Sequence, residues 1–305
     1  MRMLVVGAGS TGGYFGGRLV QAGRDVTFLV RDARANELAE HGLQIRSPRG
    51  DVTLRPQLVT AETLAGPYDA ILLTVKAFSL EGALKDMAPA VGAKTMILPV
   101  LNGMKHVDIL VNRFGEQSVV GCACKIAASV DSEGRIVQAT SVQDMAYGEM
   151  DGKESSRIQQ LDQFLKVAGI DARLSSDIEQ EMWEKWILLA AMGGINCLMR
   201  GTIGEVSQAP QGSQFALGLV EEIVAVVRTV GIPPSDKFLT AAAAALTAKE
   251  PTTSSMYRDL QQGVHIEADQ IIGDLLDRAH AASVKMPLLE LVYTNLCVYQ
   301  RRLTG

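Results

Sequence analysis

The sequence predicts an α/β fold, with an open, doubly wound parallel sheet in the N-terminal half and an all-helical C-terminal domain. Two observations support this prediction. Short apolar runs rich in β-branched residues alternate with helical patterns in the first half, and beyond residue 177 only long patterns of helical period remain. A chain of 305 residues is long enough for two domains, which we place at residues 1–175 and 176–305.

The elements of the first domain follow in order from these patterns. Four apolar runs predict buried strands, at residues 3–6, 25–30, 70–75 and 95–100. The helical patterns between and after them cover residues 12–22, 33–41, 79–88 and 105–113. Alternating segments predict an inserted strand pair at 43–59 and further strands at 118–149, with a turn at 131–134. A helix at 154–168 and a strand at 172–174 complete the unit.

The second domain is predicted to consist of long helices, at residues 177–199, 213–230, 235–248, 255–283 and 287–302. Prolines at residues 233–234 and 251 mark helix ends. Proline lacks the backbone donor and disfavours helical backbone in the residue before it.

The composition limits the partners that we expect. Lys and Arg total 29 against 34 Asp and Glu, a net charge of −5 without a basic run, which argues against nucleic-acid and membrane partners. No apolar stretch reaches the roughly 20 residues that span a bilayer, and the first glycines come too early for a signal peptide. The 4 cysteines and 4 histidines form no metal-ligand pattern. We therefore expect a soluble, cytoplasmic protein with reduced thiols and no metal.

A glycine-rich turn follows the first strand and opens the first helix, in the segment Gly7-Ala8-Gly9-Ser10-Thr11-Gly12. The first glycine permits a tight turn, the second lets a pyrophosphate approach the backbone, and the third allows helix and strand to pack closely. The helix N-terminus directs amide donors and partial positive charge at the phosphates. We predict a Rossmann-type dinucleotide site here; a glycine-rich turn without a ligand is the alternative.

Arg31 stands at the end of the second strand, where sites that prefer NAD place a carboxylate for the ribose hydroxyl. A guanidinium at that position pairs with a 2′-phosphate instead, so the sequence favours NADP. Lys76 and Asn102 follow the third and fourth strands, at the edge of the sheet where ligands bind. Lys76 is placed to meet an anionic group, and Asn102 is placed near the nicotinamide. Ordinary loop positions are the alternative for both.

Two ionisable residues of the helical domain are predicted to face apolar surroundings. Lys185 shares a helix face with Met182, Trp186, Leu189 and Met192, and desolvation there would lower its pKa toward the range useful for proton transfer. Glu267 is predicted on an apolar helix face, one turn from both Val264 and Ile271. A lysine at the core edge and a structural ion pair are the respective alternatives.

These residues belong to a set of short motifs that runs through both domains. Besides the glycine turn, the set comprises Thr74-Val75-Lys76-Ala77, Asn102-Gly103-Met104, Trp183-Glu184-Lys185, Ser254-Ser255-Met256 with Asp259, and Glu267-Ala268-Asp269 leading to Gly273. In these motifs the chain resembles the ketopantoate reductase (2-dehydropantoate 2-reductase) family over essentially its whole length.

The resemblance implies an enzyme that reduces a 2-oxo acid to a 2-hydroxy acid with hydride from NADPH. It implies that Lys185 donates the proton, Glu267 holds substrate hydroxyl groups and Ser255 binds the substrate carboxylate. It also implies that Asn102 orients ketone and nicotinamide, and that Arg31 and Lys76 hold the cofactor. The protein's own contribution is position and charge.

One departure from the family pattern concerns the substrate. Well-matched members carry asparagines four and eight residues after the lysine, where this chain has Leu189 and Gly193. Asn196 lies about one turn too far along and would need a local helix irregularity to compensate. A more apolar or larger substrate would follow, because sites with hydrogen-bonding partners discriminate strongly.

The leading hypothesis is an NADPH-dependent ketopantoate reductase of pantothenate and coenzyme A biosynthesis. The alternatives are a paralogue that reduces another 2-oxo acid, and an NADPH-sensing protein without turnover. A homodimer through the apolar helical domain is a further possibility that the sequence leaves open.

Overall fold

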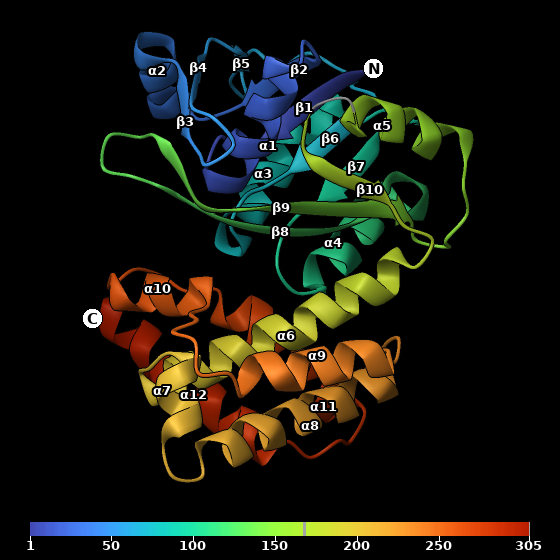
Figure 1. The fold of residues 1–305 in the computed structure, drawn as a ribbon. Coiled ribbons are helices and arrows are strands. Elements are labelled where there is room, and N and C mark those ends of the chain that lie inside the picture. The colour runs from blue at the N-terminus through green and yellow to red at the C-terminus, as the bar shows by residue number, and fades with distance from the viewer. Residues whose placement is uncertain (167–168, 305) are drawn as a thin grey trace. The chain divides into compact units, whose positions relative to one another are not determined.

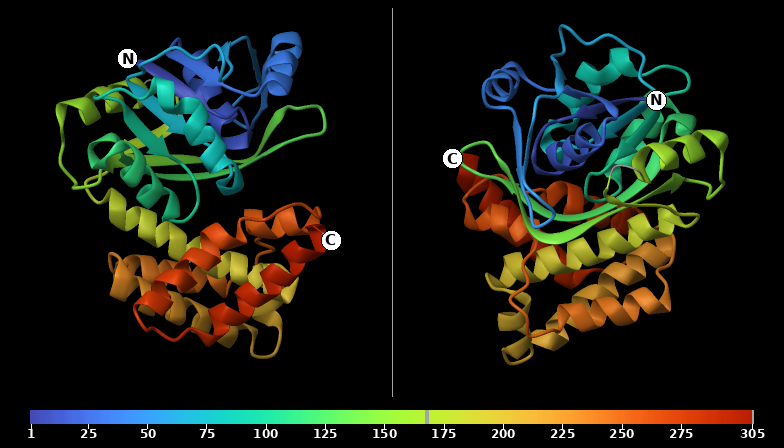
Figure 2. Two further views of the ribbon diagram at one scale, coloured as in Figure 1. Left: turned by 180° about the vertical axis from the view of Figure 1, so that it is seen from behind. Right: turned by 45° about the horizontal axis from the view of Figure 1, so that its top comes forward.

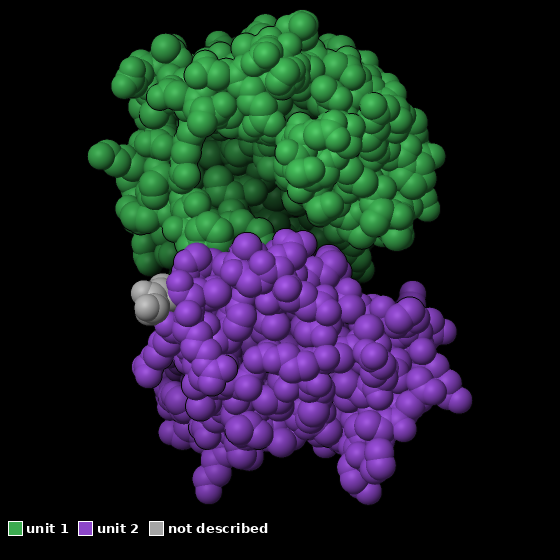
Figure 3. Space-filling view, turned by 90° about the vertical axis from the view of Figure 1, so that its left-hand side faces the viewer, with its two compact units in different colours: residues 1–101, 106–179 green, residues 102–105, 180–305 purple. Residues whose placement is uncertain are grey.

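The computed structural model describes residues 1–166 and 169–304, and the chain folds into two compact units (Figure 1). Unit 1 comprises residues 1–101 and 106–179, and unit 2 comprises residues 102–105 together with the chain from residue 180 onward. Figure 3 colours the units separately, and unit 1 is hollowed on the face shown. Residues 102–105, which belong to unit 2, thus divide unit 1 into two sequence segments.

Unit 1 is built on a sheet of parallel strands in the order β5-β2-β1-β6-β7. The strands are β1 (Arg2–Val6), β2 (Asp25–Leu29), β5 (Gln57–Val59), β6 (Ala70–Leu73) and β7 (Met96–Pro99). Four of them confirm the predicted apolar runs, and each ends up to two residues before the predicted position. The chain moves from one side of β1 to the other between β5 and β6, so the carboxyl end of β1 is the switch point where such sheets bind ligands.

The helices of unit 1 are α1 (Ser10–Gln21), α2 (Asp32–His41), α3 (Leu80–Met87), α4 (Lys105–Phe114) and α5 (Ser156–Lys166). Helix α1 approaches the sheets closely because glycines lie on its inner face. A Cβ at Gly16 would lie 2.6 Å from Phe28, and a Cβ at Gly17 would lie 2.7 Å from Ile45. Residues 167–168, the predicted end of α5, lie outside the described residues.

The residues predicted to complete the unit form a second sheet instead of extending the first. It contains β3 (Leu43–Arg46), β4 (Val52–Leu54), β8 (Val120–Val130), β9 (Ile136–Glu149) and β10 (Asp171–Leu174). The antiparallel partner β8 takes one edge of β9, so β3 and β10 share the other edge at opposite ends. Residues 43–59 therefore supply a hairpin to this sheet, and a third strand, β5, to the first sheet.

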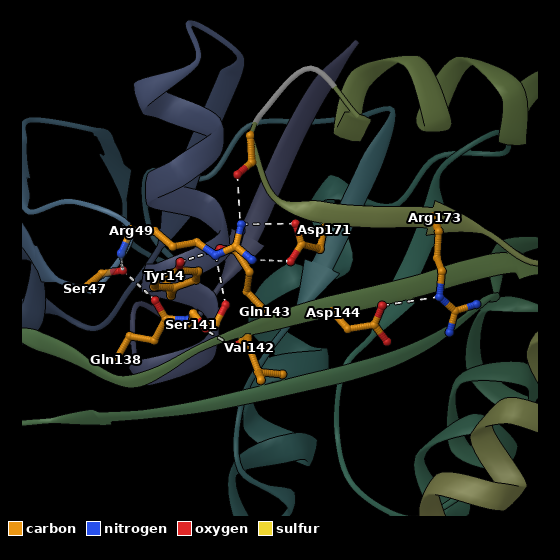
Figure 4. A network of polar contacts seen from close by, with 11 residues as sticks. Tyr14, Ser47, Arg49, Gln138, Ser141, Val142, Gln143, Asp144, Asp171 and Arg173 are labelled. Carbon is orange, nitrogen blue, oxygen red and sulfur yellow. Dashed lines mark hydrogen bonds and ion pairs between the residues drawn. The ribbon is translucent and has the colours of Figure 1, made fainter. Parts of the chain in front are cut away.

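A polar network ties the second sheet to α1 (Figure 4). Buried Tyr14 on α1 donates to Gln143 on β9, which donates in turn to a backbone carbonyl, 3.3 Å away at residue 169. Arg49, in the turn between β3 and β4, pairs with Asp171 at 2.5 Å and donates to the carbonyl of Ser141 at 2.9 Å. These bonds join segments that are far apart in the sequence.

The described residues of unit 2 form helices and connecting loops without a β-strand, which confirms the predicted fold class (Figure 2). Its helices are α6 (Ile178–Met199), α7 (Ile203–Gln208), α8 (Gly212–Val230), α9 (Asp236–Leu246), α10 (Ser255–Gln261), α11 (Asp274–Ala281) and α12 (Pro287–Thr304). Helix α6 packs closely against α8 and α12, since a Cβ at Gly194 would lie 3.1 Å from Leu219 and 3.3 Å from Val292.

The prediction of one continuous helix at residues 255–283 is wrong. Helix α10 ends at Gln261, and Gly263 follows in the left-handed region with φ +69°. The chain is irregular to Glu267 and then forms a single π-helical turn, η4 (Asp269–Gly273), before α11. Val264 is consequently 45% exposed and does not share a buried helix face with Glu267, which is 8% exposed.

Across residues 1–166 and 169–304, every helix is too short or too polar to cross a bilayer.

Candidate functional site

The glycine turn at the carboxyl end of β1 has the conformation that the sequence predicts. Gly7 has φ +96°, which favours glycine, and its amide donates to the carbonyl of Leu29 on β2 at 3.0 Å. A Cβ at Gly12 would lie 2.1 Å from the Thr74 hydroxyl and 2.3 Å from the Gly7 carbonyl oxygen. At Gly9 a Cβ would meet no described atom within 4 Å. The first and third glycines are therefore needed for the fold, whereas the second leaves space next to the backbone.

The N-terminus of α1 has the features of an anion site. Gly9 caps the helix without a side-chain hydrogen bond, and the first turn contains no acidic residue. Ser10 and Thr11 are half-buried there, and Ala8 is buried. Amide donors at the start of this 12-residue helix thus lie beside the space at Gly9.

Two side chains to which the sequence assigned no role stabilise this turn. The Thr74 hydroxyl, just beyond β6, lies 2.8 Å from the carbonyl oxygen of Val6 and 3.0 Å from that of Gly7. Arg34 on α2 donates to the carbonyl of Ala8 at 3.1 Å and pairs with Glu37 at 2.7 Å. The position of Thr74, a polar residue directly after a buried strand, was a sequence signal for its role. No sequence pattern indicated the role of Arg34.

Arg31 and Lys76 lie at the carboxyl ends of strands next to β1. Arg31 follows β2 and begins α2, and its exposed side chain makes no hydrogen bond or ion pair with residues 1–166 or 169–304. Lys76 is also exposed and precedes the short 3₁₀ turn Ala77–Ser79, two residues after Thr74. The glycine turn, the Arg31 guanidinium and the Lys76 ammonium thus follow the carboxyl ends of the adjacent strands β1, β2 and β6, respectively.

In unit 2, Lys185 lies on α6 with a half-buried side chain. Its helix neighbours Met182 and Trp186 are 4% and 1% exposed, so the lysine stands at the edge of an apolar core. The adjacent Glu184 is engaged elsewhere, because it accepts from the amide and hydroxyl of Ser235 at 2.9 and 2.8 Å.

Asn102 and Glu267 both form hydrogen bonds with the η4 turn of unit 2. Glu267 lies two residues before η4 and accepts the amide of Ile271 through its carbonyl at 3.0 Å. Gln270 within the turn donates to the carbonyl of half-buried Asn102 at 3.1 Å. The indole of Trp186 donates to the Ile271 carbonyl at 2.8 Å, which links the residue after Lys185 to the same turn. Sequence reasoning missed Gln270 and the role of Trp186.

Ser255 is the half-buried first residue of α10, and Ser254 before it caps that helix by accepting the amide of Tyr257 at 3.1 Å. Asn196 on α6 holds this segment, because it accepts the Ser254 amide at 2.8 Å and donates to the Gly201 carbonyl at 2.8 Å. The irregularity that would move Asn196 toward Lys185 is absent from α6, an α-helix from Ile178 to Met199. Asn196 is a structural residue here.

Gly193 lies against the side chain of Met256. A Cβ at Gly193 would lie 2.6 Å from the methyl group of Met256, so that methionine occupies the space that a side chain would need. Leu189, one turn after Lys185, is half-buried. Among residues 1–166 and 169–304, no cluster of His, Cys, Asp or Glu could hold a metal ion.

The fold and these residues define a two-domain protein with a Rossmann-type sheet and a helical second domain. The chain belongs to the ketopantoate reductase PanE/ApbA family, whose N-terminal model matches residues 3–152 and whose C-terminal model matches residues 177–300. It is an oxidoreductase of that family.

Relatives of known sequence or structure cover nearly the whole chain. The uncharacterized oxidoreductase YkpB of Bacillus subtilis is 35% identical over 98% of this chain and 99% of its own length. The 2-dehydropantoate 2-reductase of Mesorhizobium japonicum is 25% identical, over 96% of this chain and 95% of its own. Among solved structures, the 2-dehydropantoate 2-reductase of Geobacter metallireducens has TM-score 0.87 and 25% identity, over 97% of this chain and 99% of that one.

A D-mandelate dehydrogenase solved with NADH and anilino(oxo)acetate shares the fold. Its TM-score is 0.90 over 100% of both chains, at 21% identity.

Proposed function

We propose that this protein reduces 2-dehydropantoate (ketopantoate) to pantoate with NADPH, in pantothenate and coenzyme A biosynthesis. The observation that carries the proposal is the assembly around η4. Trp186, next to Lys185, donates a hydrogen bond to η4, the turn that follows Glu267. Gln270 of the same turn donates a hydrogen bond to Asn102. The reductases of Mesorhizobium and Geobacter, which act on this substrate by name, match the chain over nearly its full length.

The residues at the carboxyl ends of β1, β2 and β6 fit NADP. The space at Gly9 and the uncapped start of α1 suit a pyrophosphate, and the exposed Arg31 guanidinium suits a 2′-phosphate. Lys76 adds a second cation at this edge of the sheet. When bound, the nicotinamide supplies the hydride for the reduction.

The residues of unit 2 supply binding and the proton. Lys185 gives its proton to the oxygen of the ketone as negative charge develops on it, a role that typically contributes about 10²–10⁴-fold. The Asn102 amide orients the ketone, and the buried Glu267 carboxylate accepts hydrogen bonds from substrate hydroxyl groups. The Ser255 hydroxyl donates to the substrate carboxylate. No step requires a metal.

A second candidate, a reductase of a more apolar 2-oxo acid, is favoured by Leu189 and by the packing of Met256 over Gly193. A substrate hydroxyl group placed against these side chains would lose hydrogen bonds to water without replacement. Steady-state rates with NADPH, for ketopantoate and for 2-oxo acids with branched or aromatic side chains, separate the two candidates. Negligible relative activity on ketopantoate would eliminate the first. Tight NADPH binding without turnover on any of these acids would instead indicate a sensor.

The proposal includes a cytoplasmic location, since the cysteines of the described chain form no disulfide and three of the four are buried. It also includes a homodimer through the helical unit. Light scattering after size exclusion measures the mass directly, and a monomer mass at working concentrations would remove that part.

A further inference from the structure

We infer that η4 is a positioning bracket, which fixes Lys185 on α6 and the Asn102 turn relative to each other through two hydrogen bonds. The donors are Trp186 and Gln270, and both acceptors are backbone carbonyls. The inference rests on the proposed function for its catalytic consequence, because Lys185 and Asn102 take their roles from there. Neither Trp186 nor Gln270 is placed in contact with substrate, so both are positioning residues.

The hydrogen bond from Trp186 fixes the orientation of α6 about its own axis. Its indole is 1% exposed and donates to the carbonyl of Ile271 at 2.8 Å. Because Lys185 is the preceding residue, a rotation of α6 about its axis that breaks this bond also redirects the lysine. A hydrogen bond buried in a low-dielectric interior is stronger than one in water, and its carbonyl is costly to leave unpaired.

The hydrogen bond from Gln270 holds the turn at Asn102 in position. Gln270 is 6% exposed and donates to the Asn102 carbonyl at 3.1 Å. The next residue, Gly103, has φ +81°, and a Cβ there would lie 2.6 Å from the carbonyl oxygen of Gln270. The turn therefore lies against the backbone of η4 as well as its side chain.

The π-helical geometry permits both bonds at once. In η4 the amide of Asp274 donates to the carbonyl of Asp269, five residues back, so the turn is wider than an α-helical one. Single π turns of this kind are frequent at functional sites. Here Gln270 points its amide at Asn102 while the carbonyl of the next residue, Ile271, accepts from Trp186. Adjacent residues of one turn thus bind two separate segments.

The chain offers a matched control for Trp186. Its tryptophans number only 2, and Trp183 stacks on Trp186 with ring centroids 5.3 Å apart. Both rings lie under the guanidinium of Arg278, at 5.7 and 5.6 Å. Trp183 is 4% exposed, yet its buried indole nitrogen has no hydrogen-bond partner in the part of the chain that the structure describes. Replacing either ring with phenylalanine removes similar volume, but only at position 186 is a hydrogen bond lost.

The experiment compares Trp186→Phe, Trp183→Phe and Gln270→Met with the wild-type chain. We expect Trp186→Phe to lower kcat by about 5-fold or more, since an unsatisfied carbonyl is left behind, and Trp183→Phe to lower it less than about 2-fold. The pH profile of kcat should shift only in Trp186→Phe, because only that change redirects the proton donor. The dissociation constant of NADPH, which binds unit 1, should stay within about 2-fold in all three.

Equal kcat values and equal pH profiles for the two phenylalanine variants would overturn the inference. If Trp186→Phe does not fold, Gln270→Met tests the other half: amide hydrogen exchange at residues 102–104 should be faster than in the wild type. Unchanged exchange would contradict the bracket. This readout requires no turnover, so an inactive wild-type enzyme would refute the proposed function and leave the bracket open to its own test.

Discussion

Alanine in place of Gly12 is expected to destabilise unit 1, whereas alanine in place of Gly9 should preserve the fold and weaken NADPH binding. At Gly12 the new Cβ would lie 2.1 Å from the Thr74 hydroxyl and 2.3 Å from the Gly7 carbonyl oxygen. Thr74 must move by more than 1 Å to relieve this contact, since ordinary contact begins at 3.4 Å. Overpacking costs about 1–3 kcal/mol and the strained Thr74 hydrogen bond about 1 kcal/mol more.

The sum of about 2–4 kcal/mol corresponds to a Tm lower by roughly 5–15 °C for a domain of this size. At Gly9 no described atom lies within 4 Å of the new Cβ, so the Tm should stay within about 3 °C. A pyrophosphate against that backbone would meet the methyl group, and we expect the dissociation constant of NADPH to rise at least about 10-fold, or 1.4 kcal/mol.

Thermal unfolding of both variants, together with fluorescence titration of NADPH into the folded proteins, measures both quantities. An unchanged Tm for Gly12→Ala would refute the close approach of α1 to Thr74. Unchanged NADPH affinity in Gly9→Ala would show that the phosphates bind elsewhere. The pair is informative because the two changes are chemically identical.

Further predictions concern the remaining site residues and one ion pair. Arg31→Ala should lower kcat/KM with NADPH by about 10-fold or more and leave that with NADH nearly unchanged; an equal effect on both cofactors would remove Arg31 from the phosphate site. Lys185→Ala should lower kcat by about 10²-fold with little effect on NADPH affinity, and retained turnover would make it a packing residue. Glu267→Ala should mainly raise KM for the oxo acid, and an unchanged KM would exclude its contact with substrate. Burial would raise the pKa of Glu149, but hydrogen bonds from Arg157 and Ser155 outweigh it and lower the pKa. A lowered pKa stabilises the fold above about pH 4.3, so Arg157→Ala should cost about 1–3 kcal/mol at pH 7 in urea unfolding, with the difference shrinking below that pH; a constant difference would contradict the pKa direction.

The fold was predictable where one local pattern decides an element. The strands β1, β2, β6 and β7 are continuous apolar runs in the interior of a parallel sheet, and the sequence predicts them within about two residues at each end. The separation into two sheets was not predictable, because it depends on which edge of β9 receives β3 and β10. Apolar periodicity also predicted one continuous helix at 255–283, although the left-handed backbone at Gly263 interrupts it.

The sequence predicts which residues form the candidate site but not the side chains that hold those residues in place. The glycine turn and Lys185 follow from a motif in its strand-to-helix setting and from a helix face. Thr74, Arg34, Trp186 and Gln270 act mainly by donating to backbone carbonyls. For Thr74, Trp186 and Gln270 those carbonyls are 67 or more residues away along the chain. Periodicity and propensity contain no information on such pairings, and the π-helical turn that places Gln270 has no sequence signal of its own.

The central claim is that this chain transfers hydride from NADPH to a 2-oxo acid, with the proton supplied by Lys185. The most direct test follows the nicotinamide absorbance of NADPH with ketopantoate and a panel of other 2-oxo acids, for the wild-type chain and Lys185→Ala. We predict that wild-type protein consumes NADPH with at least one acid and forms the 2-hydroxy acid, and that the variant is slower by about 10²-fold or more. Wild-type protein that binds NADPH but consumes none with any acid would contradict the account.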